Sequence, residues 1–204
     1  MKNKQTKGFT LIELLVVIGI VAILSAVVIL TLNPAELLKQ SRDSNRLSDM
    51  ATLKSALSLY LADVVTPVLA SSTRGGYGGC YVSNGNLPGT ANPVTNGSTT
   101  TAGCGLFAAG AYVSTTIANL RGVNGSGWIP ADMTTISSGA PVGSLPVDPS
   151  NTGPLFYAYR ADTALTFEVN VAAMESTKFA SSSEQDGGNR SGSYEVGTDP
   201  GLDL

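Results

Sequence analysis

The 204-residue chain contains no histidine, and only 13% of its residues are charged. Without histidine it lacks the commonest general base and metal ligand, and it cannot form a Ser-His or Cys-His nucleophile pair. It also has no G-x-x-x-x-G-K-[ST] sequence, the loop with which many ATPases bind phosphate. These absences make a membrane-anchored enzyme the weakest functional hypothesis for this chain.

Basic residues are scarce as well: 12 Lys and Arg stand against 15 Asp and Glu, for a formal net charge of −3. Three of the lysines lie in the first eight residues, and without that segment the charge falls to −6. No global positive field would attract nucleic acid, so no nucleic-acid partner is expected. A local patch of Arg74, Arg121 and Arg160 leaves a binding role open.

The N-terminus combines a short basic leader, MKNKQTKG, with the apolar run FTLIELLVVIGIVAILSAVVILTL. The 24 residues of this run would form a helix about 36 Å long, enough to cross the hydrocarbon core of a membrane with some tilt. The preceding lysines predict that the N-terminus lies in the cytoplasm and the rest of the chain outside it.

The apolar run differs from an ordinary secretory signal, which is shorter and ends in a small-x-small cleavage site. The residues that follow it, Asn-Pro-Ala-Glu at 33–36, do not have that pattern. We therefore expect the apolar helix to be retained in the mature protein.

Glu13 is the one acidic residue in the apolar run. An acid inside a membrane segment indicates a functional role by default, and it needs a partner. The alternative is a capping box, because Thr10-x-x-Glu13 has the required form, with the Glu side chain reaching back to the Thr10 backbone N–H. The capping box would explain Glu13 but not the basic leader or the glycine before Phe9.

Residues 7–14, KGFTLIEL, resemble the processing motif of type IV pilins and type II secretion pseudopilins. The resemblance covers about the first thirty residues. It implies that a prepilin peptidase cuts between Gly8 and Phe9 and that the new Phe9 amine is methylated. It also implies that Glu13 seats the subunit in a filament, where a neighbour's Phe9 amine would be a suitable partner for a buried carboxylate.

The function implied is that of a structural subunit of a type IV pilus or a type II secretion pseudopilus, not an enzyme. Its partners would be further copies of itself, the peptidase and methyltransferase, an inner-membrane assembly platform and a separate assembly ATPase. The subunit would lie in the cytoplasmic membrane before assembly and in an extracytoplasmic filament afterwards. The alternative is a minor pilin that acts as a binding or adhesion module at a filament tip.

Beyond Asn33 the sequence becomes amphipathic, with apolar residues recurring at intervals of three and four. The apolar stripe comprises Leu47, Met50, Leu53, Leu57, Tyr60, Leu61 and Val64. The predicted polar face comprises Arg42, Asp43, Asn45, Arg46, Asp49, Lys54 and Asp63. We expect one helix from Phe9 to about Asp63, kinked or locally opened at Pro34, and we expect its stripe to fasten it to a head domain.

The last third of the chain predicts a sheet. Two runs, LFYAYR at 155–160 and LTFEVNV at 165–171, flank a short turn, and the second alternates apolar and polar residues. They predict an antiparallel hairpin, preceded by an extended LPVDP segment at 145–149. LPVDP followed by a Tyr-rich strand also resembles the heads of major pseudopilins.

The predicted fold class is α+β and pilin-like: a long N-terminal helix, transmembrane in its first half and amphipathic in its second, packed on a C-terminal antiparallel sheet. The expected segments are a cleaved leader at 1–8, a transmembrane or filament-core helix at 9–33, an amphipathic helix at 34–66 and an extracellular head at 67–204. Within the head, residues 67–127 are predicted to form a variable loop region with a short helix near 115–120. Residues 128–204 are predicted to be mainly β.

Two cysteines, Cys80 and Cys104, lie in the Gly/Ser/Thr-rich middle of the chain. An even number in a loop-rich, exported region predicts one disulfide, which would stabilise the fold by about 3 kcal/mol. The alternative is two unpaired thiols.

The C-terminal tail gathers oxygen ligands around glycines, including Asp186, Asn189 and Asp199. Major pseudopilins have a calcium-binding loop in the corresponding region, so the resemblance leaves a calcium site open here. The tail has no D-x-[DN]-x-[DN]-G run of the EF-hand kind, and a solvated acidic loop is the alternative. No other cofactor is predicted.

Overall fold

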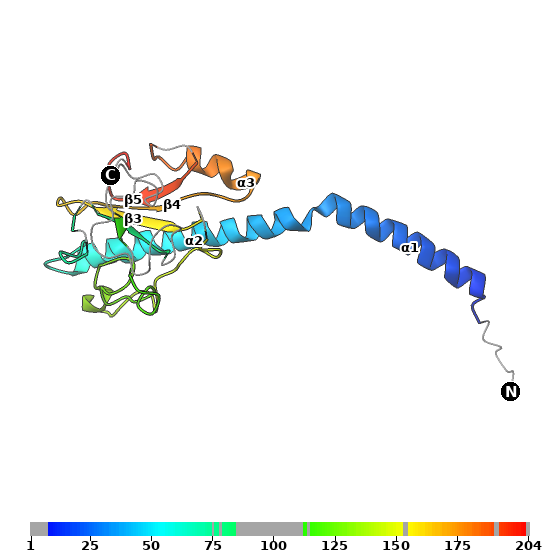
Figure 1. Ribbon diagram of the computed structural model, residues 1–204, viewed down its shortest axis with the longest axis horizontal. Helices are drawn as coiled ribbons and strands as arrows, with labels where there is room; N and C mark the ends of the chain where they lie inside the picture. The colour runs from blue at the N-terminus through cyan, green and yellow to red at the C-terminus, as the bar shows by residue number, and fades with distance from the viewer. Residues whose placement is uncertain are drawn as a thin grey trace, which may run out of the picture. The chain divides into compact units, whose positions relative to one another are not determined.

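A computed structural model of the chain describes residues 8–74, 76–77, 79–84, 112–113, 115–152, 155–189 and 192–202. The chain divides into two compact units, residues 1–39 and 40–204. The first contains the apolar helix, and the second, the head, contains the sheet (Figure 1).

Helix α1 (Leu11–Leu32) forms most of the first unit. Its two hydroxyl side chains are satisfied within the helix: the Ser25 hydroxyl donates to the Val21 carbonyl at 2.7 Å and the Thr31 hydroxyl to the Val28 carbonyl at 3.0 Å. The helix ends at Asn33, whose φ of 40° and ψ of 73° place it in the left-handed region. This left-handed residue ends the helix, and its own carbonyl accepts the Glu36 N–H at 3.0 Å in the helix that follows.

Helix α2 (Pro34–Asp63) begins directly after Asn33. The chain thus forms two helices where the sequence predicts one kinked helix, and the interruption lies at the predicted proline. Proline disfavours helical geometry in the residue before it, but it is well suited to the first position of a new helix because it has no N–H to leave unpaired.

The head contains a five-stranded sheet in the order β2-β1-β3-β4-β5. Four of its strands pair with one another in antiparallel fashion: β1 (Cys80–Val82), β3 (Tyr157–Ala161), β4 (Phe167–Val171) and β5 (Tyr194–Gly197). The short β2 (Tyr112–Val113) pairs in parallel with β1 at the edge. The α+β fold with an antiparallel sheet is therefore confirmed.

The predicted hairpin is confirmed as β3 and β4, in a register that pairs Tyr159 with Val169. Asp162 closes its turn by accepting the Thr166 N–H through Oδ1 at 2.9 Å and donating its own N–H to the Thr166 carbonyl at 3.1 Å. These bonds fix the register, and with it the face of the sheet that each side chain occupies.

One face of the sheet packs against α2, and the two layers enclose the main core (Figure 1). From α2 the core takes the predicted stripe residues Met50, Leu53, Leu57 and Tyr60, all buried. The sheet contributes Tyr157, Tyr159, Phe167, Val169 and Val171, and the connecting segments contribute Trp128, Met133 and Leu145 among others. Burial of this apolar surface is what holds α2 to the head.

The connecting segments differ from expectation in detail. Residues 115–120 form turns, not a short helix, and the predicted loop region contains β1 and β2. Between 128 and 156 the described residues form turns, isolated bridges and the 3-10 helix η1 (Met133–Thr135). After β4 come a short helix α3 (Thr177–Ala180) and the 3-10 helix η2 (Ser181–Glu184).

Candidate functional site

The predicted cleavage site lies immediately before α1. Gly8, Phe9 and Thr10 are exposed and non-helical, with Phe9 exposing 85% of its surface. A peptidase must bind its scissile bond in an accessible, non-helical segment, and the Gly8–Phe9 bond meets that condition.

Glu13 forms the capping box that its spacing allows. Its Oε2 accepts the Thr10 backbone N–H and the Thr10 hydroxyl, each at 2.8 Å, and the Thr10 hydroxyl oxygen accepts the Glu13 N–H at 3.3 Å. Both contacts to the carboxylate use Oε2, and within the described part of the chain nothing donates to Oε1. The capping box therefore leaves one carboxylate oxygen available, and an assembly role for Glu13 stays a prediction.

The surface around Glu13 is apolar. Phe9, Ile12, Val16 and Val17 surround it in a shallow hollow of about 330 Å³. From Leu11 to Ile29 the mean hydropathy of α1 reaches 3.0, and the described residues bury none of this segment. By length and composition α1 could cross a membrane. Apolar surface of this extent indicates contact with lipid or with another protein.

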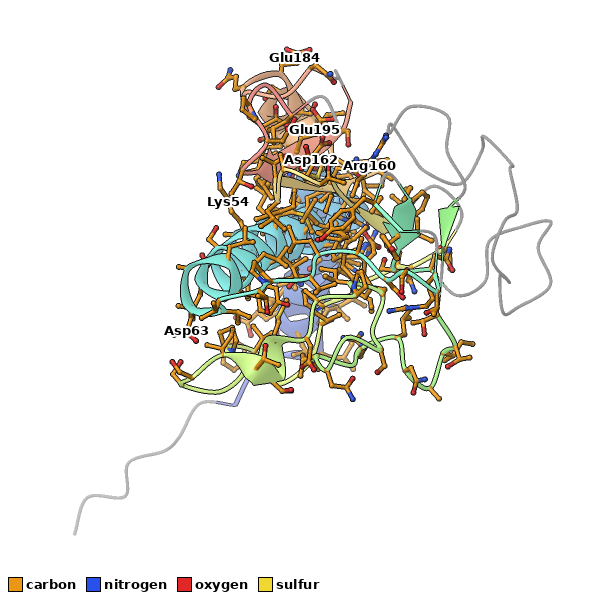
Figure 2. All side chains as sticks on the ribbon, turned by 90° about the vertical axis from the view of Figure 1, so that its left-hand side faces the viewer. Lys54, Asp63, Arg160, Asp162, Glu184 and Glu195 are labelled. Carbon is orange, nitrogen blue, oxygen red and sulfur yellow. The ribbon has the colours of Figure 1, made fainter. Side chains whose placement is uncertain are left out.

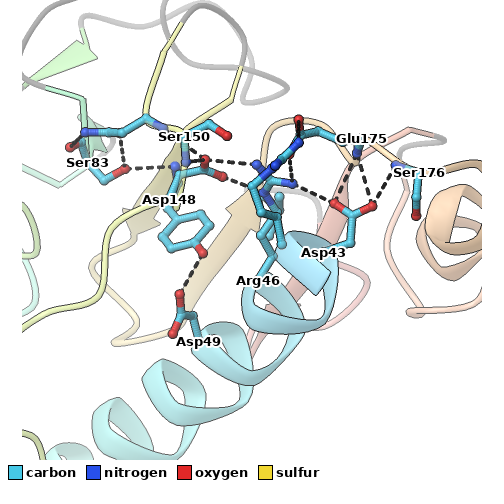
Figure 3. Close-up of polar contacts among 12 residues, drawn as sticks. Asp43, Arg46, Asp49, Ser83, Asp148, Ser150, Glu175 and Ser176 are labelled. Atoms are coloured by element: carbon cyan, nitrogen blue, oxygen red, sulfur yellow. Dashed lines mark hydrogen bonds and ion pairs between the residues drawn. The ribbon is translucent and has the colours of Figure 1, made fainter. Parts of the chain in front are cut away.

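A second polar feature, the head clasp, joins α2 to two distant loops and comprises Arg42, Asp43, Arg46, Asp148 and Glu175 (Figure 3). The Arg46 guanidinium binds Asp148 in a two-pronged contact, with Nε–Oδ2 2.6 Å and Nη2–Oδ1 3.0 Å. Its Nη1 donates to Asp43 Oδ1 at 2.6 Å and to Glu175 Oε2 at 2.8 Å. The N–H groups of the planar Arg46 guanidinium thus bind three carboxylates at once.

The same carboxylates also hold backbone. Asp43 Oδ2 accepts the Ser176 N–H at 2.7 Å, which binds the loop between β4 and α3 to α2. Asp148 Oδ1 accepts the N–H groups of Ser150 and Asn151 at 2.8 and 3.0 Å, which shapes the loop before β3. The clasp therefore fixes both loops against the same two turns of α2.

The electrostatics of the clasp follow from these contacts. Hydrogen bonds from Arg42, and then from Arg46, lower the pKa of Glu175 to about 2. Burial disfavours the Arg46 cation, but its three carboxylate partners outweigh that effect and raise its pKa above the usual value. Removing charges from water costs free energy, which offsets much of the attraction within the cluster.

Asp43 and Arg46 were predicted on the polar face of the helix, and that prediction is wrong because both are fully buried. The spacing of these residues predicts burial although their charge does not. Positions 43, 46, 50, 53, 57 and 60 follow one another at alternating intervals of three and four. Both residues therefore lie on the buried stripe of α2. A charged residue in phase with an apolar stripe predicts a buried ion pair, whose partner here comes from the LPVDP segment.

The predicted calcium residues lie in and beside the loops that flank β5. Asp186 accepts the Gly188 N–H through Oδ1 at 2.8 Å and the Glu195 N–H through Oδ2 at 2.7 Å. Asp199 Oδ1 accepts the Thr166 hydroxyl at 3.1 Å, and Asn189 is exposed. The described residues contain no group of three or more Cys, Asp or Glu placed to hold a metal ion. A calcium site stays a prediction.

The remaining predicted residues are placed as follows. Cys80 is buried in β1, whereas Cys104 lies outside the described residues, so their disulfide stays a prediction. Arg74 donates to the carbonyls of Gly125 and Gly127 at 2.6 and 2.9 Å, and Arg121 donates to a further carbonyl. At least two guanidinium groups of the suggested basic patch therefore bind the protein's own backbone.

Comparison with protein families finds that residues 3–29 match the prokaryotic N-terminal methylation motif. This motif directs prepilin-type cleavage and methylation and is typical of type IV pilins and pseudopilins, which are structural proteins and not enzymes. No curated protein and no solved structure matches the chain.

Proposed function

We propose that this chain, whose N-terminus carries the prokaryotic N-terminal methylation motif, is a structural subunit of a type IV pilus or a type II secretion pseudopilus. Cleavage between Gly8 and Phe9 releases the leader, Phe9 is methylated, and the mature subunits polymerise through α1. The observation that carries this proposal is the continuity of the motif with an apolar helix that none of the described residues covers.

The chemistry around Glu13 supports polymerisation through α1. Cleavage creates a cationic amine at Phe9, and Glu13 has an oxygen that its capping box does not use. Pairing that oxygen with the Phe9 amine of a neighbouring subunit would neutralise both charges in apolar surroundings, where an unpaired charge is unfavourable. Each subunit would thus supply both the donor and the acceptor of the contact.

The head clasp supports a role for α2 as the connection between filament and head. Helix α2 spans the boundary of the two units, and Arg42, Asp43 and Arg46 lie in its first turns within the head. In a subunit whose α1 is packed in a filament, α2 would then connect α1 to the head, and the clasp would attach α2 to the head loops.

The leader, the apolar helix and the lack of a phosphate-binding loop in the sequence indicate which partner proteins the subunit would need. A prepilin peptidase with methyltransferase activity would process the leader, and an inner-membrane platform would receive the anchored subunit. A separate ATPase would drive assembly, because the sequence contains no phosphate-binding loop. Before assembly, α1 would anchor the subunit in the cytoplasmic membrane with its N-terminus in the cytoplasm.

A second candidate, a minor subunit that binds a partner at a filament tip, is favoured by one observation. The head contains a cleft of about 810 Å³ where α2 ends. A subunit that serves only as a building block has no need of such a cleft, although a filament neighbour could also occupy it.

N-terminal mass spectrometry of the membrane and sheared-filament fractions tests the proposal. We expect a mature protein that begins with methylated Phe9. Gly8→Arg should block cleavage because a bulky cation replaces the residue before the scissile bond, whereas Gly19→Ala, which changes a glycine with open space around its Cα, should be processed normally. A mature start beyond Leu32 would contradict both the processing and the anchor.

A further inference from the structure

The cleft lies at the end of α2, whose last residue, Asp63, is labelled in Figure 2. Its walls are the segment after α2 and the segment around η1. The volume of about 810 Å³ falls within the range of small-ligand and peptide pockets. The polymerisation through α1 proposed above does not use it.

Specific hydrogen bonds hold the walls in place. The Tyr60 hydroxyl at the base accepts the Val68 N–H at 2.9 Å and donates to the Val68 carbonyl at 3.4 Å. Arg74, which does not itself line the cleft, joins the two wall segments by donating to the carbonyls of Gly125 and Gly127. The cleft is therefore preformed, which lowers the entropy lost when a ligand binds.

The lining combines apolar and aromatic surface with one carboxylate. Val68 and Tyr77 expose 53% and 39% of their surfaces, so both are available to a ligand. Among the described residues that line the cleft, Asp132 is the only charged one. Its Oδ1 accepts the Thr134 N–H at 3.0 Å and the Thr134 hydroxyl at 2.5 Å, while its Oδ2 has no hydrogen-bond partner in the described part of the chain.

This lining is complementary to an organic cation. An aromatic ring attracts an ammonium or guanidinium group, and a carboxylate oxygen accepts a strong hydrogen bond from it. The wider field has the same sign, because residues 40–204 carry eight Lys and Arg against thirteen Asp and Glu. The cleft is too large for the cation alone but has room for a basic side chain with its neighbouring residues.

We propose that this cleft binds a basic peptide segment of a partner protein. An Arg or Lys side chain would donate to Asp132 Oδ2 and lie against the Tyr77 ring, while flanking apolar residues would contact Val64, Val68 and Pro130. The inference goes beyond the proposed filament function and does not rest on it.

Fluorescence anisotropy with the processed full-length chain in detergent micelles tests the inference. The probe is fluorescein-labelled Ala-Val-Arg-Val-Ala amide, compared with the same peptide carrying Gln in place of Arg. We expect the Arg peptide to bind about tenfold more tightly at low salt, because only its cation can pair with Asp132. Added salt should reduce that difference.

Three variants identify the site. Asp132→Asn keeps the Oδ1 acceptor for Thr134 but removes the charge, so it should bind the Arg peptide no better than the Gln peptide. Tyr77→Ala should weaken the Arg peptide several-fold. The matched control is Asp162→Asn, since Asp162 also holds a backbone N–H through Oδ1 but lies beside Arg160 and away from Asp63 (Figure 2). That control should bind as the unaltered chain does.

Equal binding of the two peptides, an Asp132→Asn variant that binds normally, or an equal loss in Asp162→Asn would overturn the inference. Free arginine methyl ester that binds as tightly as the peptide would also overturn it, because the site would then recognise a small cation and not a peptide. Filament yield is recorded for every variant. A failure of peptide binding in a chain that still forms filaments would therefore refute this inference and leave the filament function intact.

Discussion

Glu13 and Arg46 each interrupt a row of apolar residues on a helix, and they differ in what neutralises their charge. Arg46 has three carboxylate partners within its own chain. Among the described residues, the Glu13 carboxylate accepts hydrogen bonds only from the hydroxyl and backbone N–H of Thr10, neither of which carries a charge. The charge of Arg46 is thus neutralised within the folded chain, whereas the described part of the chain supplies no cation for Glu13.

Two substitutions at the start of α1 separate capping from assembly. Glu13→Gln keeps an acceptor for the Thr10 N–H but removes the charge, whereas Thr10→Val removes the capping hydroxyl and keeps the charge. If Glu13 pairs with a neighbour's amine, Glu13→Gln should lower the filament yield by about tenfold or more, because a charge-assisted hydrogen bond is lost at every subunit. Thr10→Val should assemble nearly normally.

Sheared-filament yield divided by total processed protein is the measurement, since both variants should still be cleaved. The capping box alone predicts the opposite order: Gln is acceptable in a capping box, and Val is a poor N-cap. Normal filaments from Glu13→Gln together with poor filaments from Thr10→Val would show that Glu13 acts only within its own helix.

Arg46→Met tests the clasp at the level of one side chain. The substitution keeps length and apolar bulk but leaves Asp43 and Asp148 buried without their cation. We expect the free energy of unfolding of the head to fall by about 3–5 kcal/mol, the cost of breaking a buried ion pair. Urea unfolding followed by the fluorescence of Trp128, the single tryptophan and fully buried in the core, measures it. The exposed Lys54→Met is the control and should change little.

At the scale of elements, the clasp makes the attachment of the loop between β4 and α3 depend on pH. The pKa of Glu175 is lowered to about 2 by its arginine partners, against an ordinary value near 4.3 in an unfolded chain. Between these values the unfolded state binds the proton and the folded state does not, so the contribution of Glu175 grows as pH rises. It is complete above the unfolded pKa and is lost as pH falls toward 2.

Glu175→Gln should remove this dependence. We expect the free energy of unfolding of the unaltered chain to fall more steeply than that of the variant between pH 5 and pH 2.5, and the two slopes to agree between pH 6 and pH 8. Trp128 fluorescence in urea at each pH provides the curves. Parallel curves throughout the acid range would mean that Glu175 titrates as it does in the unfolded chain.

The elements differ in how far the sequence determines them. The β3–β4 hairpin and the α2 stripe were predictable because alternation and helical period are local patterns. The break at Pro34 was predictable from backbone sterics. The partners of Arg46 were not, since Asp148 and Glu175 lie 102 and 129 residues away and their approach depends on the whole fold. Local sequence specifies that a buried cation needs a carboxylate, but not which one.

The N-terminal site shows the same distinction. The KGFTLIEL pattern and the apolar run predict cleavage and anchoring because both depend on short contiguous segments. The capping box was also predictable, as its partners are three residues apart. The cleft beside Asp132 had no sequence signal, because its walls come from two segments, ending at Tyr77 and beginning at Gly125, that are 48 residues apart and meet only in the folded head.

At the scale of the whole molecule, folding and surface contact are divided between the two units. The core and the clasp lie within residues 40–204, whereas the apolar surface of α1 finds no cover in the described chain. The head therefore has what a domain needs in order to fold alone. The first unit has what an anchor or a filament core needs, and little that could hold it together in water.

A chain that begins at Gln40 tests this division. We expect it to be a water-soluble monomer that unfolds in one cooperative transition, with Trp128 as buried as in the full-length protein. The truncation removes one partly exposed ion pair of α2, Lys39–Glu36 at 3.9 Å, so the head should lose no more than about 1 kcal/mol. Sedimentation and urea unfolding at neutral pH measure both properties against the processed full-length chain in micelles.

The same truncated chain should be excluded from filaments when it is exported beside the full-length subunit. Its head would retain every described contact of the clasp and the cleft, so any head-to-head affinity would still be available to it. If filaments nevertheless incorporated it, the head would be sufficient for assembly and α1 would serve only as an anchor. If the truncated chain stayed soluble while the full-length chain polymerised, the apolar surface of α1 would be the part of the molecule that assembly requires.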